Sequence, residues 1–170
     1  MRAFLTNRTA TVGIANLRRK IFHLPNKGTP QGSVVSPLLF NVALLKLPRL
    51  LDTVPGIFHA LYADDITLWT RGACTGEQEA RLQEAVNIIE RYLNTCGLHC
   101  APDKSELLVL GERTRGWPPS HDAPDPQVLL QGVPMPKVGS LRVLGVHIHK
   151  DGPAPSHSPG YTTPWHSLLI

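Results

Sequence analysis

Asp64 and Asp65 are neighbouring carboxylates at the centre of the stretch Phe58–Thr70, with a short apolar run on each side. This arrangement predicts a β-hairpin that presents both acids at its turn. Two adjacent anions repel each other unless a cation lies between them, and Mg²⁺ or Mn²⁺ prefers carboxylate oxygens. Two such ions about 4 Å apart can hold the attacking and leaving oxygens of a phosphoryl transfer. Asp is also common in ordinary turns, so the pair alone leaves both interpretations open.

The distribution of charge separates the first third of the chain from the rest. Residues 1–51 contain no Asp or Glu, and all thirteen acids follow from Asp52 onward. The same 51 residues carry eight basic side chains: Arg2, Arg8, Arg18, Arg19, Lys20, Lys27, Lys46 and Arg49. A basic segment beside paired carboxylates favours binding of a polyanion, although a solvated basic face explains the charge equally well. No residue before Asp52 can supply a third carboxylate.

Length and composition indicate a globular chain large enough for one domain with a core. The 170 residues are 42% hydrophobic and 18% charged. No apolar run approaches the roughly 20 residues of a membrane span, and the first residues do not resemble a secretory signal. The three cysteines are expected to be free thiols, which suits a reducing compartment. We therefore expect an intracellular protein, in the cytoplasm or the nucleus.

The segment from Gly28 to Asn41 combines two glycines with Pro30 and Gln31. Glycines allow close approach of a backbone to a ligand, and Gln31 offers a donor and an acceptor. Ser36 followed by Pro37 predicts a helix start, and the apolar residues after it predict a buried helix that Pro48 ends or kinks. An ordinary turn before a capped helix explains the segment as well.

The remaining elements follow from periodicity. The alternation of apolar residues predicts a hairpin formed by residues 9–15 and 17–24. The helical period predicts one amphipathic helix over residues 75–96, with a capping box at Thr75–Gln78 and a stop at Gly97. Residues 107–110 predict a short buried strand. We expect 128–133 and 141–148 to pair as a last hairpin, with His147 and His149 on one face. Residues 151–170 are rich in Pro, Gly and Ser, which predicts a disordered tail.

Four motifs occur in a fixed order along residues 1 to about 150. They are Gly28-x-Pro30-Gln31-Gly32-x-x-x-Ser36-Pro37-Leu38-x-Phe40-Asn41, Tyr62-Ala63-Asp64-Asp65, Gly97-Leu98 to Lys104-Ser105-Glu106, and Leu144-Gly145-Val146. This order resembles the reverse transcriptase domain of non-LTR (LINE-like) retrotransposons, especially the arthropod, tick-transposon type. A turn interpretation of Asp64 and Asp65 predicts none of the companion motifs.

The resemblance implies a role for each matched residue. Asp64 and Asp65 correspond to the metal-binding carboxylates, with Asp64 the more direct ligand. Lys104 corresponds to a lysine beside the departing pyrophosphate, where a cation offsets developing charge. The nucleotide- and template-binding positions are Gly28, Pro30, Gln31, Gly32, Ser36 and Phe40, and the hairpin that grips the primer end is Leu144, Gly145 and Val146. The implied cofactors are two Mg²⁺ or Mn²⁺ ions, and the partners are an RNA or DNA template-primer and deoxynucleoside triphosphates.

The resemblance also implies that the chain is a truncated fragment. Family members carry a further metal-binding aspartate on a strand that would lie before residue 1. We therefore expect an α+β fold, the C-terminal half of a right-hand polymerase palm, with an antiparallel sheet and helices on one face. Residues 1–150 would be this partial palm and 151–170 the tail. The expected function is that of a fragment of an RNA-directed DNA polymerase. The alternative is an inactive transposon remnant that binds nucleic acid non-specifically at most.

Overall fold

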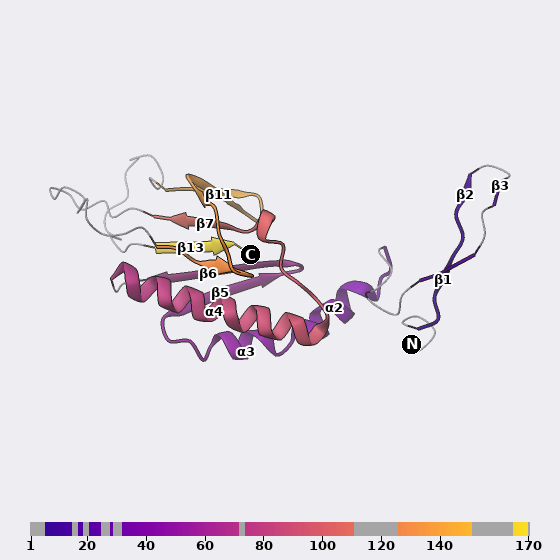
Figure 1. Ribbon diagram of the computed structural model, residues 1–170, viewed down its shortest axis with the longest axis horizontal. Helices are drawn as coiled ribbons and strands as arrows, with labels where there is room; N and C mark the ends of the chain where they lie inside the picture. Colours follow the sequence, from indigo (N-terminus) through magenta and orange to yellow (C-terminus); the bar gives the residue numbers. More distant parts are fainter. Residues whose placement is uncertain are drawn as a thin grey trace. The chain divides into compact units, whose positions relative to one another are not determined.

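The computed structural model describes residues 6–14, 17–18, 21–24, 28, 32–71, 74–110, 126–150 and 165–169 of the chain (Figure 1). The chain divides into two compact units, residues 1–43 and 44–170. The 44–170 unit contains Asp64 and Asp65 and every element that begins after residue 44. No helix of the described residues is long and apolar enough to cross a membrane.

The unit formed by residues 1–43 contains short antiparallel strand pairs. β1 (Thr9–Ala10) pairs with β4 (Phe22–His23), and β2 (Gly13–Ile14) pairs with β3 (Leu17–Arg18), which confirms the predicted hairpin. Residues 1–5 lie outside the described residues.

α2 (Ser36–Leu44) begins at the predicted serine and continues across the unit boundary. Just before it, the Val35 amide donates to the Ser33 hydroxyl at 3.3 Å. The expectation of a buried helix is wrong, because Leu44 is its one buried residue and Leu38 and Val42 are each 59% exposed. An apolar sequence predicts burial only where another element is placed to cover it.

The unit formed by residues 44–170 is built on a five-stranded sheet. α3 (Leu47–Leu51) comes first, with Pro48 in its first turn, so this proline starts a helix where we expected it to end one. β5 (Ile57–Tyr62) and β6 (Asp65–Arg71) then form the predicted hairpin. α4 (Thr75–Cys96), the short 3₁₀ helix η1 (Pro102–Lys104) and β7 (Glu106–Val109) follow. With β10 (Lys137–Val138) and β13 (Trp165–Leu169), the sheet order is β10-β7-β13-β6-β5.

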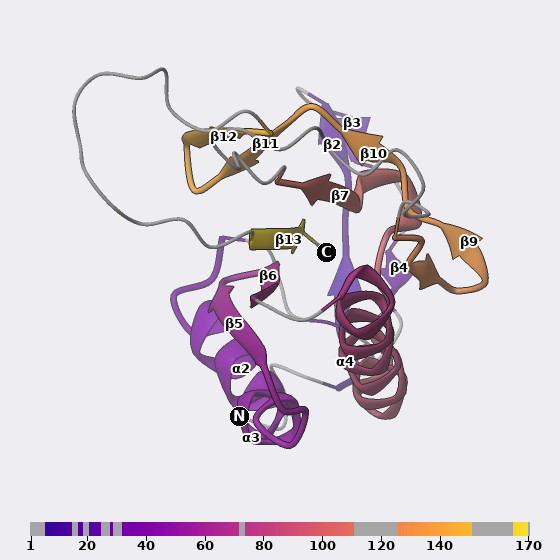
Figure 2. The same cartoon turned by 90° about the vertical axis from the view of Figure 1, so that its left-hand side faces the viewer.

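One face of this sheet is covered by helices. α4 contacts β5 and β6, while α3 contacts both α4 and β5, and Figure 2 shows α4 beside the succession of β5, β6, β13 and β7. The buried apolar side chains of these elements form the core: Leu47, Leu51, Ile57, Ile66, Leu68, Leu82, Ala85, Val86, Ile89, Leu93, Leu107 and Leu108. α4 ends at Gly97, as predicted, and the φ of Gly97 is 70°, a left-handed value. The predicted capping box does not form, because the N-cap is Cys74 and its side chain makes no capping bond.

The end of the described chain corrects the expected last hairpin. β8 (Leu129–Leu130) pairs with β9 (Val133–Pro134), and β11 (Ser140–Val143) pairs with β12 (Val146–His149). Each two-residue turn, Gln131-Gly132 and Leu144-Gly145, has positive φ at both positions, so each run folds back on itself. Between the two hairpins, β10 (Lys137–Val138) adds to β7 in parallel. The rings of His147 and His149 share a face as predicted, with centroids 6.5 Å apart.

The expectation of disorder over 151–170 is corrected at five residues. Trp165–Leu169 forms β13, which pairs antiparallel with both β6 and β7. The physical reason is that β6 and β7 offer backbone N–H and C=O groups as hydrogen-bond partners for this segment. The composition of residues 151–170 alone carries no information about these partners. Residues 151–164 lie outside the described residues.

Candidate functional site

The turn between β5 and β6 carries the two carboxylates. Tyr62 pairs with Asp65 across the hairpin, which leaves Ala63 and Asp64 as the two turn residues. Ala63 has a φ of 51°, a left-handed conformation that a residue with a Cβ adopts at a cost of about 1–2 kcal/mol. Ile66 and Leu68 anchor β6 in the core and Ile57 anchors β5, so the turn projects from a packed support.

Neither carboxylate is neutralised by the protein in the part of the chain that the structure describes. Asp64 and Asp65 are both exposed, and no described residue forms a side-chain hydrogen bond or an ion pair with either. Their mutual repulsion is therefore relieved by solvent or by a bound cation. Mg²⁺ and Mn²⁺ suit this donor set, because they accept one or two carboxylates and complete their coordination with water and substrate phosphates.

The donor set stops at two carboxylates among the residues described. They contain no cluster of three or more His, Cys, Asp or Glu side chains that could hold a metal ion. Two carboxylates fit one hard divalent ion that keeps several waters, while a rigid two-ion centre needs a further ligand. Asp64 and Asp65, which the sequence predicts as metal ligands, are thus adjacent and exposed in the structure, and the metal site itself stays a prediction.

The sheet face that carries Tyr62 and Asp65 also carries an aromatic row. Phe58 pairs with Trp69 across the hairpin, and their rings stack with centroids 5.9 Å apart. The Arg71 guanidinium lies 5.3 Å from the centre of the Phe58 ring. Phe58 is 43% and Tyr62 is 65% exposed, whereas the alternate residues Ile57 and Ile66 are buried.

Sequence reasoning missed this row, although its signal was present. Residues at alternate positions of a strand share a face, and Phe58, Ala60 and Tyr62 alternate with Ile57, His59 and Leu61. Extending the alternation through the hairpin register to Trp69 and Arg71 would have placed them on the same face as Asp65.

Lys104 lies at the same end of the sheet as the carboxylates. It is the last residue of η1, exposed, and two residues before β7 begins at Glu106. Leu169 of β13 pairs with both Thr67 and Glu106, so Thr67, the third residue of β6, lies level with Glu106, the first residue of β7. Of the predicted residues, Asp64, Asp65 and Lys104 are therefore brought to one edge.

The other predicted residues belong to other elements of the chain. Leu144 and Gly145 form the β11–β12 turn, with φ of 48° and 86°, and Val146 begins β12; Leu144 is 58% and Val146 is 64% exposed. Gly28 and Gly32 have φ of 69° and 86°, values that favour glycine. Ser36 begins α2, and Phe40 is half-buried within it. Pro30 and Gln31 lie outside the described residues, and this segment belongs to the 1–43 unit.

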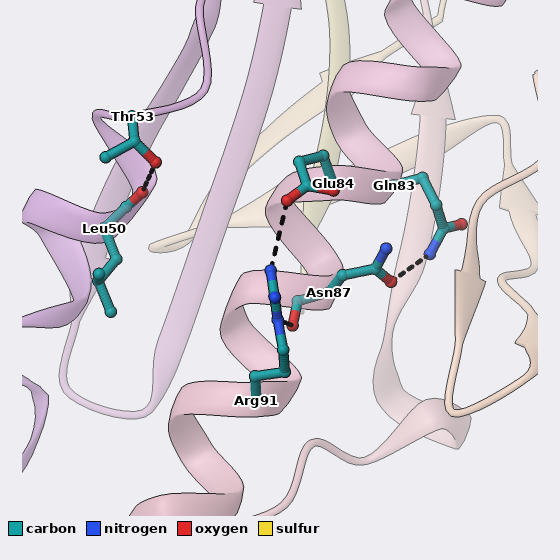
Figure 3. A network of polar contacts seen from close by, with 6 residues as sticks. All are labelled: Leu50, Thr53, Gln83, Glu84, Asn87 and Arg91. Atoms are coloured by element: carbon teal, nitrogen blue, oxygen red, sulfur yellow. Dashed lines mark hydrogen bonds and ion pairs between the residues drawn. The ribbon is translucent and has the colours of Figure 1, made fainter.

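The acids of α4 contrast with the turn, because each has a partner. Glu84 accepts from Arg91 at 3.3 Å, and Arg91 also donates to the Asn87 carbonyl (Figure 3). Glu77 pairs with Arg81. Glu79 and Glu90 accept backbone amides of Gln127 and Gln131. The carboxylates of these acids are thus engaged by other parts of the fold, unlike those of Asp64 and Asp65.

Two open hollows border α4, and neither includes the carboxylate turn. One, of about 440 Å³, has walls from α3 and α4 that include Leu50, Ile88 and Tyr92. The other, of about 300 Å³, is bordered by Glu90, Cys100 and Gln131. Burial, with the nearby Glu90 charge, raises the pKa of Cys100 from 9.0 to about 11, which keeps this thiol protonated near neutral pH.

Comparison with known proteins gives two matches. The family model described as "Reverse transcriptase (RNA-dependent DNA polymerase)" matches residues 1–148. A curated protein of Drosophila melanogaster, "Probable RNA-directed DNA polymerase from transposon BS", is 30% identical over 114 residues. These cover 62% of this chain and 12% of that protein, so the chain corresponds to a small part of its relative's length. No solved structure matches the chain.

Proposed function

This chain belongs to the reverse transcriptase family, and from that premise we propose that it is a fragment of a retrotransposon RNA-directed DNA polymerase whose metal ligands are Asp64 and Asp65. The observation that carries the proposal is the β5–β6 turn, with two adjacent, exposed carboxylates that no described residue neutralises. A turn of purely structural importance gains nothing from two uncompensated charges.

In the reaction we propose, the 3′ hydroxyl of a primer attacks the α-phosphorus of a deoxynucleoside triphosphate. One P–O bond forms, the bond to the leaving pyrophosphate breaks, and the hydroxyl proton passes to solvent or a nearby base. Mg²⁺ or Mn²⁺, when bound, lowers the pKa of the attacking hydroxyl and offsets charge on the phosphates. Asp64 and Asp65 would hold these cations. Lys104, at the same sheet edge, is suited to neutralise the departing pyrophosphate.

The open sheet face gives the nucleic acid a path to this edge. Phe58 and Trp69 lie about 13 Å from the Tyr62–Asp65 pair, the length of four strand residues, and Arg71 lies about 20 Å from Asp65, the length of six. Exposed aromatic rings and a guanidinium contact sugars and bases without reading their sequence. The face therefore suits the primer strand behind its 3′ end.

The finer assignments are part of the same proposal. The fold is a partial polymerase palm of the non-LTR type, and Gly28, Pro30, Gln31, Gly32, Ser36 and Phe40 contact template and incoming nucleotide. Leu144, Gly145 and Val146, at an exposed hairpin turn, contact the primer. The basic residues before Asp52 contact phosphates, so binding of nucleic acid should weaken as salt rises.

A second candidate function is favoured by the two-carboxylate donor set. The described residues supply no third ligand, and two carboxylates hold cations weakly and in poorly fixed geometry, whereas positioning supplies most of the rate of phosphoryl transfer. We therefore propose that this chain by itself binds nucleic acid and metal but extends primers very slowly or not at all.

The test combines metal binding with primer extension. Mn²⁺ binding, measured by electron paramagnetic resonance, should weaken on the order of 10-fold in Asp64→Asn and in Asp65→Asn. Asp52→Asn is the matched control: Asp52 is an exposed acid paired with His59 at 3.0 Å, in the loop before β5, at the end of the hairpin away from the turn. Equal Mn²⁺ affinity in all three variants would remove the metal site from the proposal.

Primer extension on poly(rA)/oligo(dT) then separates the two candidates. Synthesis that disappears in Asp64→Asn and persists in Asp52→Asn would show that the chain is active as it stands. Binding without synthesis would favour the second candidate. Template binding that does not change between low and high salt would contradict the role given to the basic residues.

A further inference from the structure

The outward face of the β11–β12 hairpin carries two histidines that the proposed function does not use. His147 and His149 are alternate residues of β12, and both are exposed. Their rings lie 24° from parallel, with centroids 6.5 Å apart. Neither ring has a hydrogen bond or an ion pair with any residue that the structure describes. Both imidazoles are therefore available to a ligand from solvent.

The hairpin supports the two rings from its other face. Leu141 is fully buried, and its cross-strand partner Ile148 is half-buried between the two histidines of the pair. β11 contacts β7 of the five-stranded sheet, and Figure 2 shows β11 and β12 side by side. The Lys150 amide donates to the Gly139 carbonyl at 3.0 Å, which continues the ladder past His149. The backbone of the histidine pair is thus already ordered, so a ligand bound there needs to order little more than two side chains.

The separation of the rings suits one shared metal ion. A bond from zinc to an imidazole nitrogen is about 2.0–2.1 Å long, so two imidazoles on one tetrahedral ion have ring centroids about 5 Å apart. The rings of His147 and His149 would therefore have to approach each other by about 1.5 Å. Because the χ2 torsion of histidine has broad minima and both side chains are exposed, small side-chain rotations achieve this without a change in the strand.

The donor type indicates which metal ions the pair would take. Imidazole nitrogen suits Cu²⁺, Ni²⁺ and Zn²⁺, whereas carboxylate oxygen suits Mg²⁺ and Mn²⁺. The described residues contain no group of three His, Cys, Asp or Glu around one point, so water would complete the coordination. Arg142 pairs with His147 on the same face, and its charge would weaken binding of a dication by about 3-fold after screening by water and salt.

We propose that His147 and His149 form a two-imidazole site for a borderline divalent transition-metal ion. Cu²⁺ binds most tightly and Zn²⁺ more weakly, in line with the general order of affinities for nitrogen ligands. The ligands of this site and its preferred metals both differ from those of the β5–β6 turn. The proposal does not rest on the proposed function, because it uses neither Asp64 nor Asp65.

The first test counts the nitrogens bound to Cu²⁺ by electron paramagnetic resonance in the full-length chain. The exposed Cys74 and Cys96 are first blocked with iodoacetamide, because free thiols bind and reduce Cu²⁺, and excess Mg²⁺ is present to occupy carboxylates. One equivalent of Cu²⁺ should bind two imidazoles in the wild type and one in His147→Ala or His149→Ala, with affinity lowered on the order of 10-fold.

A third exposed histidine provides the matched control for these variants. His99 lies in the loop after α4, and His99→Ala should bind Cu²⁺ as the wild type does. Equal Cu²⁺ affinity in the wild type, His147→Ala and His149→Ala would overturn the proposal.

The second test uses the hairpin register to restore the site. Arg142 lies directly opposite His147, so Arg142→His in a His149→Ala chain places a second imidazole on the same face from the neighbouring strand. This double variant should regain two bound nitrogens. Its matched control is Arg142→Gln in the His149→Ala chain, which removes the same charge without adding a ligand and should keep one nitrogen. If the two double variants bind Cu²⁺ alike, the geometry of the hairpin does not make the site, and the proposal is wrong.

Further outcomes separate this site from other positions of the ion. Asp64→Asn should leave Cu²⁺ affinity unchanged, and a loss of Cu²⁺ binding there would place the ion at the β5–β6 turn and overturn the proposal. Four bound nitrogens, with dimerisation by sedimentation only when Cu²⁺ is present, would place the ion between two copies and overturn a site within one chain. Two bound nitrogens in a wild type that does not bind Mn²⁺ would support the histidine site and contradict the proposed function alone.

Discussion

The acids of α4 and the acids of the β5–β6 turn differ in what surrounds them. All four acids of the helix, Glu77, Glu79, Glu84 and Glu90, bind a basic side chain or a backbone amide. Asp64 and Asp65 have no side-chain hydrogen bond or ion pair with any residue that the structure describes, and they stand next to each other. The first group stabilises the fold, and the second is available to a ligand.

The α4 acids also show how the helix holds an edge of the protein. Glu79, Gln83 and Glu90 accept the amides of Gln127, Leu129 and Gln131, alternate residues of one extended segment. The helix side chains thereby satisfy donors that a further strand would otherwise take. The comparison teaches that an acid's partners indicate its role here better than its charge or exposure does.

The largest expected effect comes from breaking the support under the turn. Leu68 is fully buried in β6, so Leu68→Ala should lower the free energy of unfolding by about 3 kcal/mol and weaken Mn²⁺ binding through the loosened hairpin. Urea unfolding measures the first effect. Val146→Ala, at a position 64% exposed in β12, should change stability by less than about 0.5 kcal/mol. Similar losses in the two variants would show that the β5–β6 hairpin is no better supported than the β11–β12 hairpin.

The next effect concerns the thiol beside the helix acids. Burial and then the Glu90 charge raise the pKa of Cys100 to about 11, so at pH 9 only about 1% of this thiol is ionised in the folded chain. Iodoacetamide should therefore modify the exposed Cys74 and Cys96 well before Cys100. Glu90→Gln should lower the pKa of Cys100 and speed its modification.

The same shift predicts how stability varies with pH. The folded chain keeps the Cys100 proton that the unfolded chain begins to lose near pH 9, so this contribution to stability is complete below pH 9. It declines as the pH rises from about 9 to about 11. Urea midpoints across this range, compared with those of Cys100→Ser, isolate the contribution. A midpoint difference that grows with pH would contradict the assignment.

α4 and the β5–β6 hairpin were predictable because the patterns that indicate them lie within their own residues. Residues 57–71 and 75–96 carry clear periods, and Gly97 supplies the expected left-handed stop. The metal-binding candidates followed from two adjacent acids and the order of the motifs. The β11–β12 turn had a local signal as well, since a residue followed by Gly favours a two-residue turn, and our longer pairing overlooked it.

What sequence did not predict depends on distant partners. The burial of α2 depends on which element covers it, and the aromatic row at Phe58 and Trp69 depends on the hairpin register. β13 is the strongest case: Trp165–Leu169 follows a Pro-rich stretch, and the strands it pairs with lie about 60 to 100 residues earlier. Composition reports a segment's own preferences and not the unpaired edges it can reach.

A smaller effect, on the free energy of unfolding, should differ in sign between the α4 acids and the acids of the β5–β6 turn. Glu90→Ala removes the acceptor of the Gln131 amide and should lower the free energy of unfolding by about 1 kcal/mol. Asp65→Asn removes a repulsive charge and should leave the urea midpoint equal or raised, while Mn²⁺ binding is lost. Salt should narrow the difference between Asp65→Asn and the wild type. A lowered midpoint in Asp65→Asn would mean that Asp65 has a structural partner, which would remove the contrast.

The smallest effect concerns the backbone that holds Asp64. Ala63 and Leu144 occupy the same place in their turns, with φ of 51° and 48°. Glycine relieves the left-handed strain at either position but adds freedom to the unfolded chain, so Ala63→Gly and Leu144→Gly should each stabilise by about 0.5 kcal/mol. Only Ala63→Gly should also weaken Mn²⁺ binding, by a few-fold, because it loosens the peptide that positions Asp64. If the two variants bind Mn²⁺ alike, the strained turn contributes nothing to the site, and the carboxylates act through their adjacency alone.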